Sequence, residues 1–274
     1  MKNTIKILGN HIIFSYIFAE SMEIITLTTD LGNQDFYAGL LKGKLLSLNR
    51  SLNIIDITHQ INPFDIPSAA FQVRSILHAF PEQTIHIALV NAFEQNAVMA
   101  AVEVQNQWII VPDNRMASMI MQTHVQEGYS LKSEILKDEP DLFSQIARIV
   151  QHLLDNQVNE LVKIPLKPAQ WFYPSVYGDT LRGMIIHIDR FGNCISNIHQ
   201  TDFMNEQKNR RFELSLRNLK IRKIHHRYFE VEKGDAIAYF GLSGFLEIAI
   251  REANAGALLG IKVFDQFTIE FFND

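Results

Sequence analysis

Hydrophobic and polar residues follow two different periods in the first half of the chain. Short apolar, β-branched runs at residues 24–28, 53–57 and 84–90 predict three strands. Between them, residues 36–48 and 68–80 place apolar side chains at the spacing of helices with one buried face. Strands that alternate with such helices predict βαβ units, and therefore an α/β domain with a mostly parallel sheet.

The later part of this domain adds a hairpin and a further helix. Apolar runs at residues 98–104 and 108–111 predict two strands, and Asn106-Gln107 between them is typical of a tight hairpin. Residues 142–154 place their apolar side chains on one face, which predicts an amphipathic helix.

Beyond Gly178 the sequence consists almost entirely of short strand patterns. They cover residues 183–188, 212–216, 236–240, 246–250 and 267–272. A polar and aromatic segment with three prolines precedes them, which indicates a domain boundary. The sequence therefore predicts four parts, namely an N-terminal extension (1–22), an α/β domain (23–165), a linker (166–178) and an all-β domain (179–274).

Composition limits the classes of function. The chain has 274 residues with 25 Lys and Arg against 30 Asp and Glu, a net charge of −5, whereas binding to a phosphate backbone requires a basic excess. The single cysteine, Cys194, excludes an internal disulfide and a cysteine metal cage. No stretch approaches the roughly 20 apolar residues of a membrane span. We therefore expect a cytoplasmic protein with neither nucleic acid nor membrane as a partner.

The first 22 residues carry a weak targeting signal. Lys2 and Lys6 precede a short apolar run at residues 12–19, an order that faintly resembles a signal peptide. Met22 stands immediately before the first predicted strand. We favour an extension or an early start of the chain over a targeting segment.

Asp30 is the first candidate for chemistry. It follows the first strand, at the edge of the sheet where open α/β folds bind ligands, and a carboxylate there can accept both hydroxyls of a ribose. No Gly-x-Gly-x-x-Gly follows, which favours a nucleoside without a pyrophosphate over a dinucleotide. A helix cap or turn is an equally good interpretation of Asp30, and Asp35 has the same alternatives.

The loop after the second strand contains a histidine between two aspartates. Asp56, His59 and Asp65 are possible metal ligands, but no second histidine supports them, so a structural histidine is the better interpretation. Phe64 and Asp65 directly precede a predicted helix, where a hydrophobic staple and a helix cap are the structural alternative.

A second cluster follows the first strand of the all-β domain. Asp189, Phe191 and Asn193 place a carboxylate, an aromatic ring and an amide within five residues. An aromatic ring can stack on a purine, an amide can pair with an adenine edge and a carboxylate can hold an ammonium, so the cluster suits a small zwitterionic nucleoside. Without other context, a β-turn after a strand is the favoured interpretation.

An ordered set of short motifs extends from about residue 23 to about residue 264. They include Thr28-Thr29-Asp30-Leu31-Gly32, Asp56-Ile57-Thr58-His59, Pro112-Asp113-Asn114, Asp189-Arg190-Phe191-Gly192-Asn193, and Ser243-Gly244 with Glu247-Ile248-Ala249. In this order the motifs resemble the S-adenosylmethionine (SAM) hydroxide adenosyltransferase family, relatives of the halide-using fluorinase and chlorinase.

This resemblance implies a SAM-binding α/β domain and a β-barrel-like second domain. It also implies a homotrimer with ligand sites between neighbouring subunits. The family reaction is attack of water or hydroxide on C5' of the ribose, which yields adenosine and methionine. SAM is the substrate, and the resemblance implies neither a metal nor another cofactor.

The resemblance also implies roles for individual residues. Asp30 would hold the ribose hydroxyls, Phe64 would line the ribose and C5', and Asp189 would meet the methionine ammonium. Phe191 and Asn193 would contact adenine. The remaining substrate-binding candidates are Asp35, Tyr228 as a second adenine-stacking aromatic, and Ser243.

The sequence departs from the family pattern where chemistry is expected. Asn91 stands where the family has an aspartate, no arginine follows it, and residues 140–143 lack the family histidine. Gly241 replaces a family asparagine. Asn91 can still orient a water, and Glu94 is the only nearby candidate base, with a solvated loop glutamate as the alternative.

The leading prediction is hydrolysis of SAM, and the alternative is a SAM- or adenosine-binding protein without turnover. Halide transfer is a weaker prediction, because no small dry halide pocket is evident.

Overall fold

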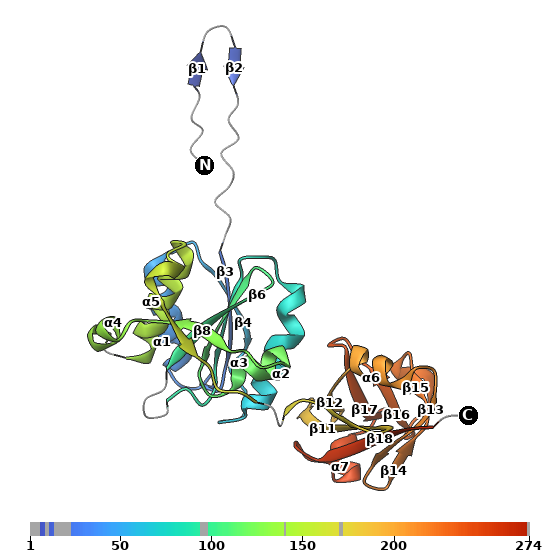
Figure 1. Ribbon diagram of the computed structural model, residues 1–274. Coiled ribbons are helices and arrows are strands. Elements are labelled where there is room, and N and C mark those ends of the chain that lie inside the picture. The colour runs from blue at the N-terminus through green and yellow to red at the C-terminus, as the bar shows by residue number, and fades with distance from the viewer. Residues whose placement is uncertain are drawn as a thin grey trace.

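The computed structural model describes residues 6–8, 11–13, 23–93, 98–139, 141–169 and 172–272. Two lobes lie side by side, an α/β lobe followed by a β-rich lobe (Figure 1). Two short strands, β1 (Lys6–Leu8) and β2 (His11–Ile13), pair with each other antiparallel. The rest of the predicted extension lies outside the described residues. Within the described ranges, no helix is both long enough and apolar enough to cross a bilayer.

The described part of the α/β lobe is built on a seven-stranded sheet. In spatial order its strands are β4 (Asn53–Thr58), β3 (Ile24–Thr29), β5 (Ile85–Leu89), β7 (Gln107–Pro112), β6 (Met99–Val104), β8 (Glu127–Ser130) and β9 (Val162–Pro165). The pairings from β4 to β7 are parallel, whereas those from β7 to β9 are antiparallel.

The sheet is therefore mixed, and the predicted mostly parallel order holds for only half of it. The reason is the hairpin between β6 and β7, which the sequence does predict. Gln105 and Asn106 take left-handed φ values of 50° and 59°, and this tight turn reverses the chain. The strand β8 then pairs with β6, and β9 pairs with β8, so both extend the sheet beyond the hairpin.

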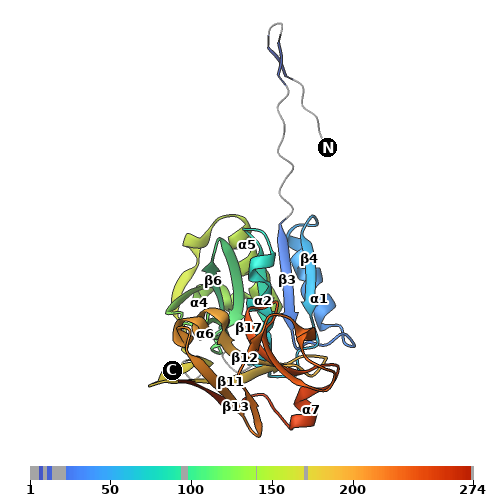
Figure 2. The ribbon, with the colours of Figure 1, turned by 90° about the vertical axis from the view of Figure 1, so that its right-hand side faces the viewer.

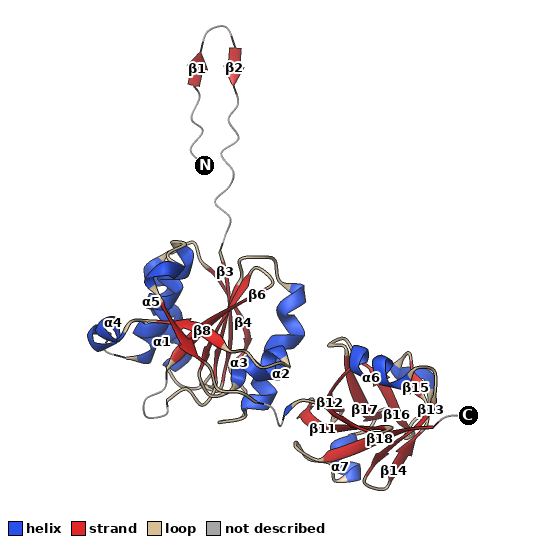
Figure 3. Cartoon of the chain, viewed as in Figure 1, coloured by secondary structure: helices blue, strands red, loops and turns tan. Residues whose placement is uncertain are grey.

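Helices cover both faces of this sheet (Figure 3). One face carries α1 (Tyr37–Leu48) and α5 (Leu142–Leu154), which share one buried cluster. The other face carries α2 (Ile66–Ile76) and α3 (Met116–Met121). A short helix, α4 (Ser133–Asp138), precedes α5, and the 3-10 turns η1 (Leu77–Ala79) and η2 (Val158–Glu160) follow α2 and α5.

The helix α2 begins where the sequence predicts a cap. Asp65 is its N-cap and accepts a hydrogen bond from the N–H of Ser68 at 3.1 Å, with Pro67 in the first turn. Phe64 does not act as a buried staple, because its side chain is 72% exposed.

The second lobe is a nearly closed, barrel-like sheet. Its strands are β10 (Ser175–Tyr177), β11 (Thr180–Ile188), β12 (Cys194–His199), β13 (Arg211–Leu216), β14 (Leu219–Ile221), β15 (Ile224–His225), β16 (Ala236–Phe240), β17 (Phe245–Ile250) and β18 (Gln266–Phe272). The sheet curls around its own core until β14 contacts β16. Two helices, α6 (Gln200–Gln207) and α7 (Ala255–Leu259), and the 3-10 turn η4 (Tyr228–Glu230) complete this lobe.

The two lobes share a buried junction at α2. Figure 2 views the molecule from the barrel side and shows β12 and β17 in front of this helix. The Oγ of Ser68 lies 2.8 Å from Nδ1 of His187 in β11, and the Phe71 ring stacks on the same histidine at 5.0 Å. Phe71 also meets Phe245 edge-on at 5.9 Å. These contacts fix the barrel against the first half of α2.

His86 makes the stability of the first lobe depend on pH. Its ring is 1% exposed, with Nδ1 2.7 Å from Thr26 Oγ1 and Nε2 3.2 Å from Gln107 Oε1. Burial lowers the pKa of His86 from 6.5 to about 4. We expect the free energy of unfolding to fall as the pH falls from about 6.5 to about 4, because only the unfolded chain takes up this proton there.

For this histidine the expected loss is about 1.4 kcal/mol per pH unit. Urea unfolding of the wild type and of His86→Gln at about pH 7 and about pH 5 measures it. Glutamine retains hydrogen-bonding groups without titrating, so the variant should lose this part of the pH dependence. Equal pH dependence in the two proteins would contradict the assignment.

Candidate functional site

The carboxylate of Asp30 joins loops that follow neighbouring strands of the first sheet. Asp30 comes directly after β3, and its Oδ2 accepts hydrogen bonds from the N–H groups of Phe64 and Asn91, each at 3.1 Å. Phe64 follows β4 and Asn91 follows β5, so these predicted residues meet at the carboxyl ends of three parallel strands. Ligands of open α/β sheets bind at such ends.

Both partners of Asp30 have a left-handed backbone. The φ angle is 69° at Phe64 and 51° at Asn91, a conformation that is unfavourable for a bulky residue such as phenylalanine and better tolerated by asparagine. Asn114 supports the same edge, because its Nδ2 donates to the carbonyl of Val90 at 2.9 Å. The exposed ring of Phe64 stands beside this network, where it can contact a ligand.

Asp35 does not take part in this network. Asp35 is exposed, and its carboxylate has no hydrogen bond or ion pair among the residues that the structure describes. The candidate base Glu94 lies outside the described residues. The N-cap of α1 is Phe36, so the alternative that Asp30 or Asp35 caps this helix is wrong.

The second predicted cluster is a closed turn after β11. Oδ1 of Asp189 accepts the N–H groups of Phe191 and Asn193 at 2.9 Å, and its Oδ2 accepts Nδ2 of Asn193 at 3.0 Å. Gly192 has a φ of 85°, and a Cβ there would lie 2.3 Å from the side chain of Asn254. The turn buries Asn193 and leaves the Phe191 ring 76% exposed. The predicted β-turn is thus confirmed.

A cleft of about 760 Å³ lies between α2 and the barrel. This volume is in the usual range of small-molecule sites. Four predicted residues line it, namely Asp189, Phe191, Asn193 and Ser243. From α2 the lining residues are Phe71, Gln72, Ser75 and Ile76.

Four ionisable residues that line this cleft are absent from the sequence-based site, namely His78, His187, Tyr239 and Glu247. The hydroxyl of Tyr239 donates to Oε2 of Glu247 at 2.5 Å, and His187 lies beside Asp189 in the lining. Burial and the charge of Asp189 raise the pKa of Glu247, whereas burial lowers the pKa of His187. The signal that could have identified Glu247 is a single acid inside the apolar run from Phe245 to Ile250.

Tyr228 lies next to this cleft but is not part of its lining. Its hydroxyl donates to the carbonyl of Ile250 at 3.3 Å and accepts the N–H of Glu252 at 2.7 Å. Its ring meets that of Tyr239 edge-on at 6.0 Å. Tyr228 therefore packs behind a residue of the cleft.

Within one chain the predicted residues form two groups. Asp30, Phe64 and Asn91 meet at the strand ends, and none of them lines the cleft that contains Asp189 and Phe191. The helix α2 connects the two groups, because it begins just after Phe64 and lines the cleft with its second half.

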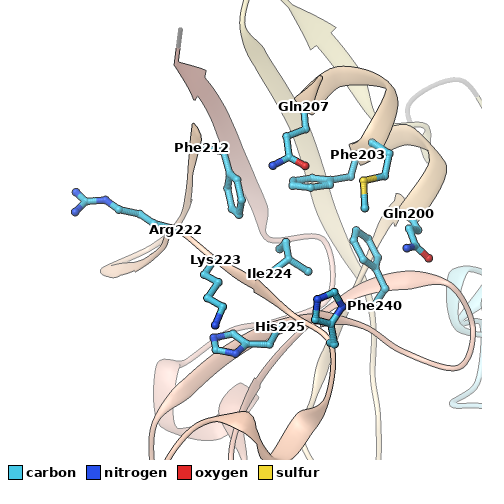
Figure 4. Close-up of a pocket in the computed structure, with 11 residues that line it drawn as sticks. Gln200, Phe203, Gln207, Phe212, Arg222, Lys223, Ile224, His225 and Phe240 are labelled. Atoms are coloured by element: carbon cyan, nitrogen blue, oxygen red, sulfur yellow. The ribbon is translucent and has the colours of Figure 1, made fainter. Parts of the chain in front are cut away.

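A second cavity, of about 390 Å³, lies inside the barrel lobe beside α6 (Figure 4). Phe203, Phe212 and Phe240 surround it, while Arg222 points away from it and pairs with Glu213 at 2.6 Å. None of the predicted site residues lines this cavity. It is separate from the cleft at α2.

The possible metal ligands have other partners. Asp56 pairs with Lys42 at 2.6 Å and with Nε2 of His59 at 3.1 Å. Nδ1 of His59 lies 2.8 Å from Thr29 Oγ1, and Asp65 caps α2. The described ranges contain no group of three or more His, Cys, Asp or Glu side chains arranged to hold a metal ion. His59 is a buried structural histidine.

Known proteins resemble the chain along both lobes. The family models for the SAM hydroxide adenosyltransferase N-terminal and C-terminal domains match residues 25–152 and 183–268. The (R)-S-adenosyl-L-methionine hydrolase of Methanocaldococcus jannaschii is 28% identical, and the match covers 93% of this chain and 98% of that protein. A fluorinase of Actinoplanes sp. is 23% identical, with 67% and 74% covered.

A solved structure shares the fold. An uncharacterized conserved protein from Thermotoga maritima matches with a TM-score of 0.75 and 23% identity, covering 89% of this chain and 99% of that chain.

The Asp30 network makes a testable contribution to stability. Asp30→Ala leaves the N–H groups of Phe64 and Asn91 without their acceptor, so we expect a loss of roughly 1–3 kcal/mol in the free energy of unfolding. The matched control is Asp35→Ala, which removes an exposed carboxylate and should change stability by less than about 0.5 kcal/mol. Urea unfolding measures both variants. If Asp30→Ala and Asp35→Ala lower the free energy of unfolding equally, Asp30 does not stabilise the loops that contain Phe64 and Asn91.

Proposed function

Because the chain belongs to the SAM hydroxide adenosyltransferase family, we propose that it hydrolyses S-adenosyl-L-methionine to adenosine and L-methionine. The observation that carries this proposal is the similarity to the (R)-S-adenosyl-L-methionine hydrolase, which covers 93% of this chain and 98% of that protein. Because the match extends over nearly all of both proteins, the proposal does not depend on similarity in one domain alone.

The chemistry needs little from the protein beyond placement. The oxygen of water attacks C5' of the ribose, the C5'–S bond breaks, and its electron pair goes to sulfur, which leaves as the neutral thioether of methionine. A sulfonium is already an activated leaving group, so the enzyme mainly aligns and partly dehydrates the attacking water. The proton that the water loses passes to a base or to solvent.

The binding roles follow the predicted residues. The Asp30 carboxylate holds the ribose hydroxyls beside Phe64, with Asp35 near the same edge. In the cleft, Asp189 takes the methionine ammonium. Phe191 and Asn193 contact adenine, while Ser243 and Tyr228 complete the second group. Asn91, next to Asp30, orients the water, and Glu94 accepts its proton.

Assembly would complete the site. The Asp30 group does not line the cleft that contains Asp189, so a neighbouring subunit that brings the two groups together would let one ligand contact both. A homotrimer with sites between subunits satisfies this requirement. The proposal includes a cytoplasmic location, no metal or other cofactor, and no nucleic-acid or membrane partner.

A second candidate is a protein that binds SAM or adenosine without turnover. Asn91 favours it, because an amide at this position, beside Asp30, does not accept a proton as the family aspartate would. Binding of SAM without release of adenosine would distinguish this candidate from the hydrolase.

Hydrolysis in ¹⁸O-labelled water tests the reaction directly. We expect adenosine and methionine in equal amounts, with the label in the 5'-hydroxyl of adenosine, because water attacks C5'. Chromatography with mass spectrometry measures both products. Absence of adenosine above a protein-free control, or unlabelled adenosine, would contradict the proposed reaction.

Two substitutions test the catalytic residues. We expect Asn91→Ala and Glu94→Ala each to lower kcat on the order of 10²-fold or more, as for the loss of a group that orients or deprotonates the nucleophile. Glu103→Ala, an exposed position on β6, is the matched control and should leave kcat unchanged. Wild-type kcat in Asn91→Ala and in Glu94→Ala would remove both residues from the mechanism.

A further inference from the structure

Glu247 is an acid held within the cleft by its neighbours. It lies on β17 directly opposite Tyr239 on β16, whose hydroxyl donates to its Oε2 at 2.5 Å. A Cβ on Gly241 would lie 1.8 Å from its Oε1. The carboxyl therefore lies where a side chain at residue 241 would displace it, and residue 241 is the position at which the sequence departs from the family asparagine.

The lining of the cleft provides no strong cation for this acid. Its carboxylates are those of Glu247 and Asp189, and none of the described lining residues is a lysine or an arginine. The basic groups are His78, which is exposed, and His187, whose Nδ1 is engaged with Ser68. Two neighbouring carboxylates repel each other, and either a proton on one of them or a cation between them relieves the repulsion.

An independent observation at Asn193 points to a ligand with hydrogen-bond donors. Asn193 is 8% exposed and lines the cleft, and its Nδ2 donates to Asp189. Its Oδ1 is buried and has no hydrogen-bond partner in the described structure. A buried acceptor without a donor is unfavourable, so a donor supplied by a ligand would stabilise it.

The acceptors of the cleft differ in charge. The Asp189 and Glu247 carboxylates are charged hydrogen-bond acceptors, whereas Oδ1 of Asn193 is an uncharged acceptor that the amino group of adenine can satisfy. A primary ammonium carries three donors, one positive charge and no acceptor. It therefore complements the two carboxylates in both charge and hydrogen bonding.

We propose that Glu247 is a substrate-binding residue, and that its carboxylate joins Asp189 in binding the primary ammonium of the amino-acid part of the ligand. This inference rests on the proposed function and adds a residue to it. Tyr239 positions the carboxylate through its hydroxyl, and Gly241 leaves the space that the carboxylate occupies. The charge of the pair selects ligands with the amino-acid moiety over the bare nucleoside.

Two ligands that differ in the amino-acid part provide the test. S-adenosylhomocysteine carries the ammonium, whereas 5'-methylthioadenosine has the same nucleoside without it, and neither is a sulfonium. Calorimetry of both ligands with wild type and Glu247→Gln measures the effect. Glutamine keeps the size of the side chain and the acceptor for Tyr239 but removes the charge.

We expect Glu247→Gln to raise the Kd of S-adenosylhomocysteine on the order of tenfold, because the variant loses a charge-assisted hydrogen bond. The Kd of 5'-methylthioadenosine should change by less than about twofold. Gly241→Ala should have the same selective effect, because its Cβ displaces the carboxyl. The matched control Glu103→Gln should bind both ligands as the wild type does.

The outcomes separate this inference from the proposed function. Wild type that binds neither ligand overturns both. If the wild type binds both ligands and Glu247→Gln binds S-adenosylhomocysteine with the same Kd as the wild type, only the role of Glu247 is overturned. If Glu247→Gln raises the Kd of both ligands equally, Glu247 has a structural role, and the inference is again overturned.

Discussion

The packing of α2 against the barrel is the constraint on which both parts of the candidate site depend. Ser68 and Phe71 hold His187 of β11, two residues before Asp189. The same helix begins at the Asp65 cap, immediately after Phe64. One helix therefore sets the loop that meets Asp30 and one wall of the cleft. A displacement of α2 would disturb both groups together.

Acidic groups dominate the chemistry of these surfaces. Asp30 uses its carboxylate to organise backbone N–H groups at the strand ends, whereas Glu247 and Asp189 line a cleft without lysine or arginine among its described residues. Such a setting attracts a cationic ligand and disfavours an anionic one. It agrees with the positive charges on the sulfonium and ammonium of SAM, and with the net charge of −5 of the chain.

Much of the fold was predictable from periodicity. The strand ending before Asp30 and the helix at 142–154 were predicted from clear apolar patterns, and the structure confirms them. The strand β12 was missed because it contains Ser196 and Asn197, both fully buried. Asn197 is satisfied by hydrogen bonds to Phe172 and Met184, which an apolar pattern does not reveal.

Other features depend on pairings that a linear pattern does not contain. The helix α6 buries only Phe203, so it has no apolar stripe to detect. The mixed sheet order depends on which strand the β6–β7 hairpin joins. Glu247 became a candidate only when the register of β16 and β17 placed it opposite Tyr239. By contrast, the Asp30 and Asp189 groups were predictable because each follows a strand within a short motif.

The most direct test of the account is a crystal structure of the protein with S-adenosylhomocysteine bound. The account predicts a ligand between subunits, with its ribose hydroxyls on the Asp30 carboxylate of one subunit and its adenine against Phe191 and Asn193 of another. A ligand that contacts only one of these two groups, or that lies in the cavity beside α6, would contradict it.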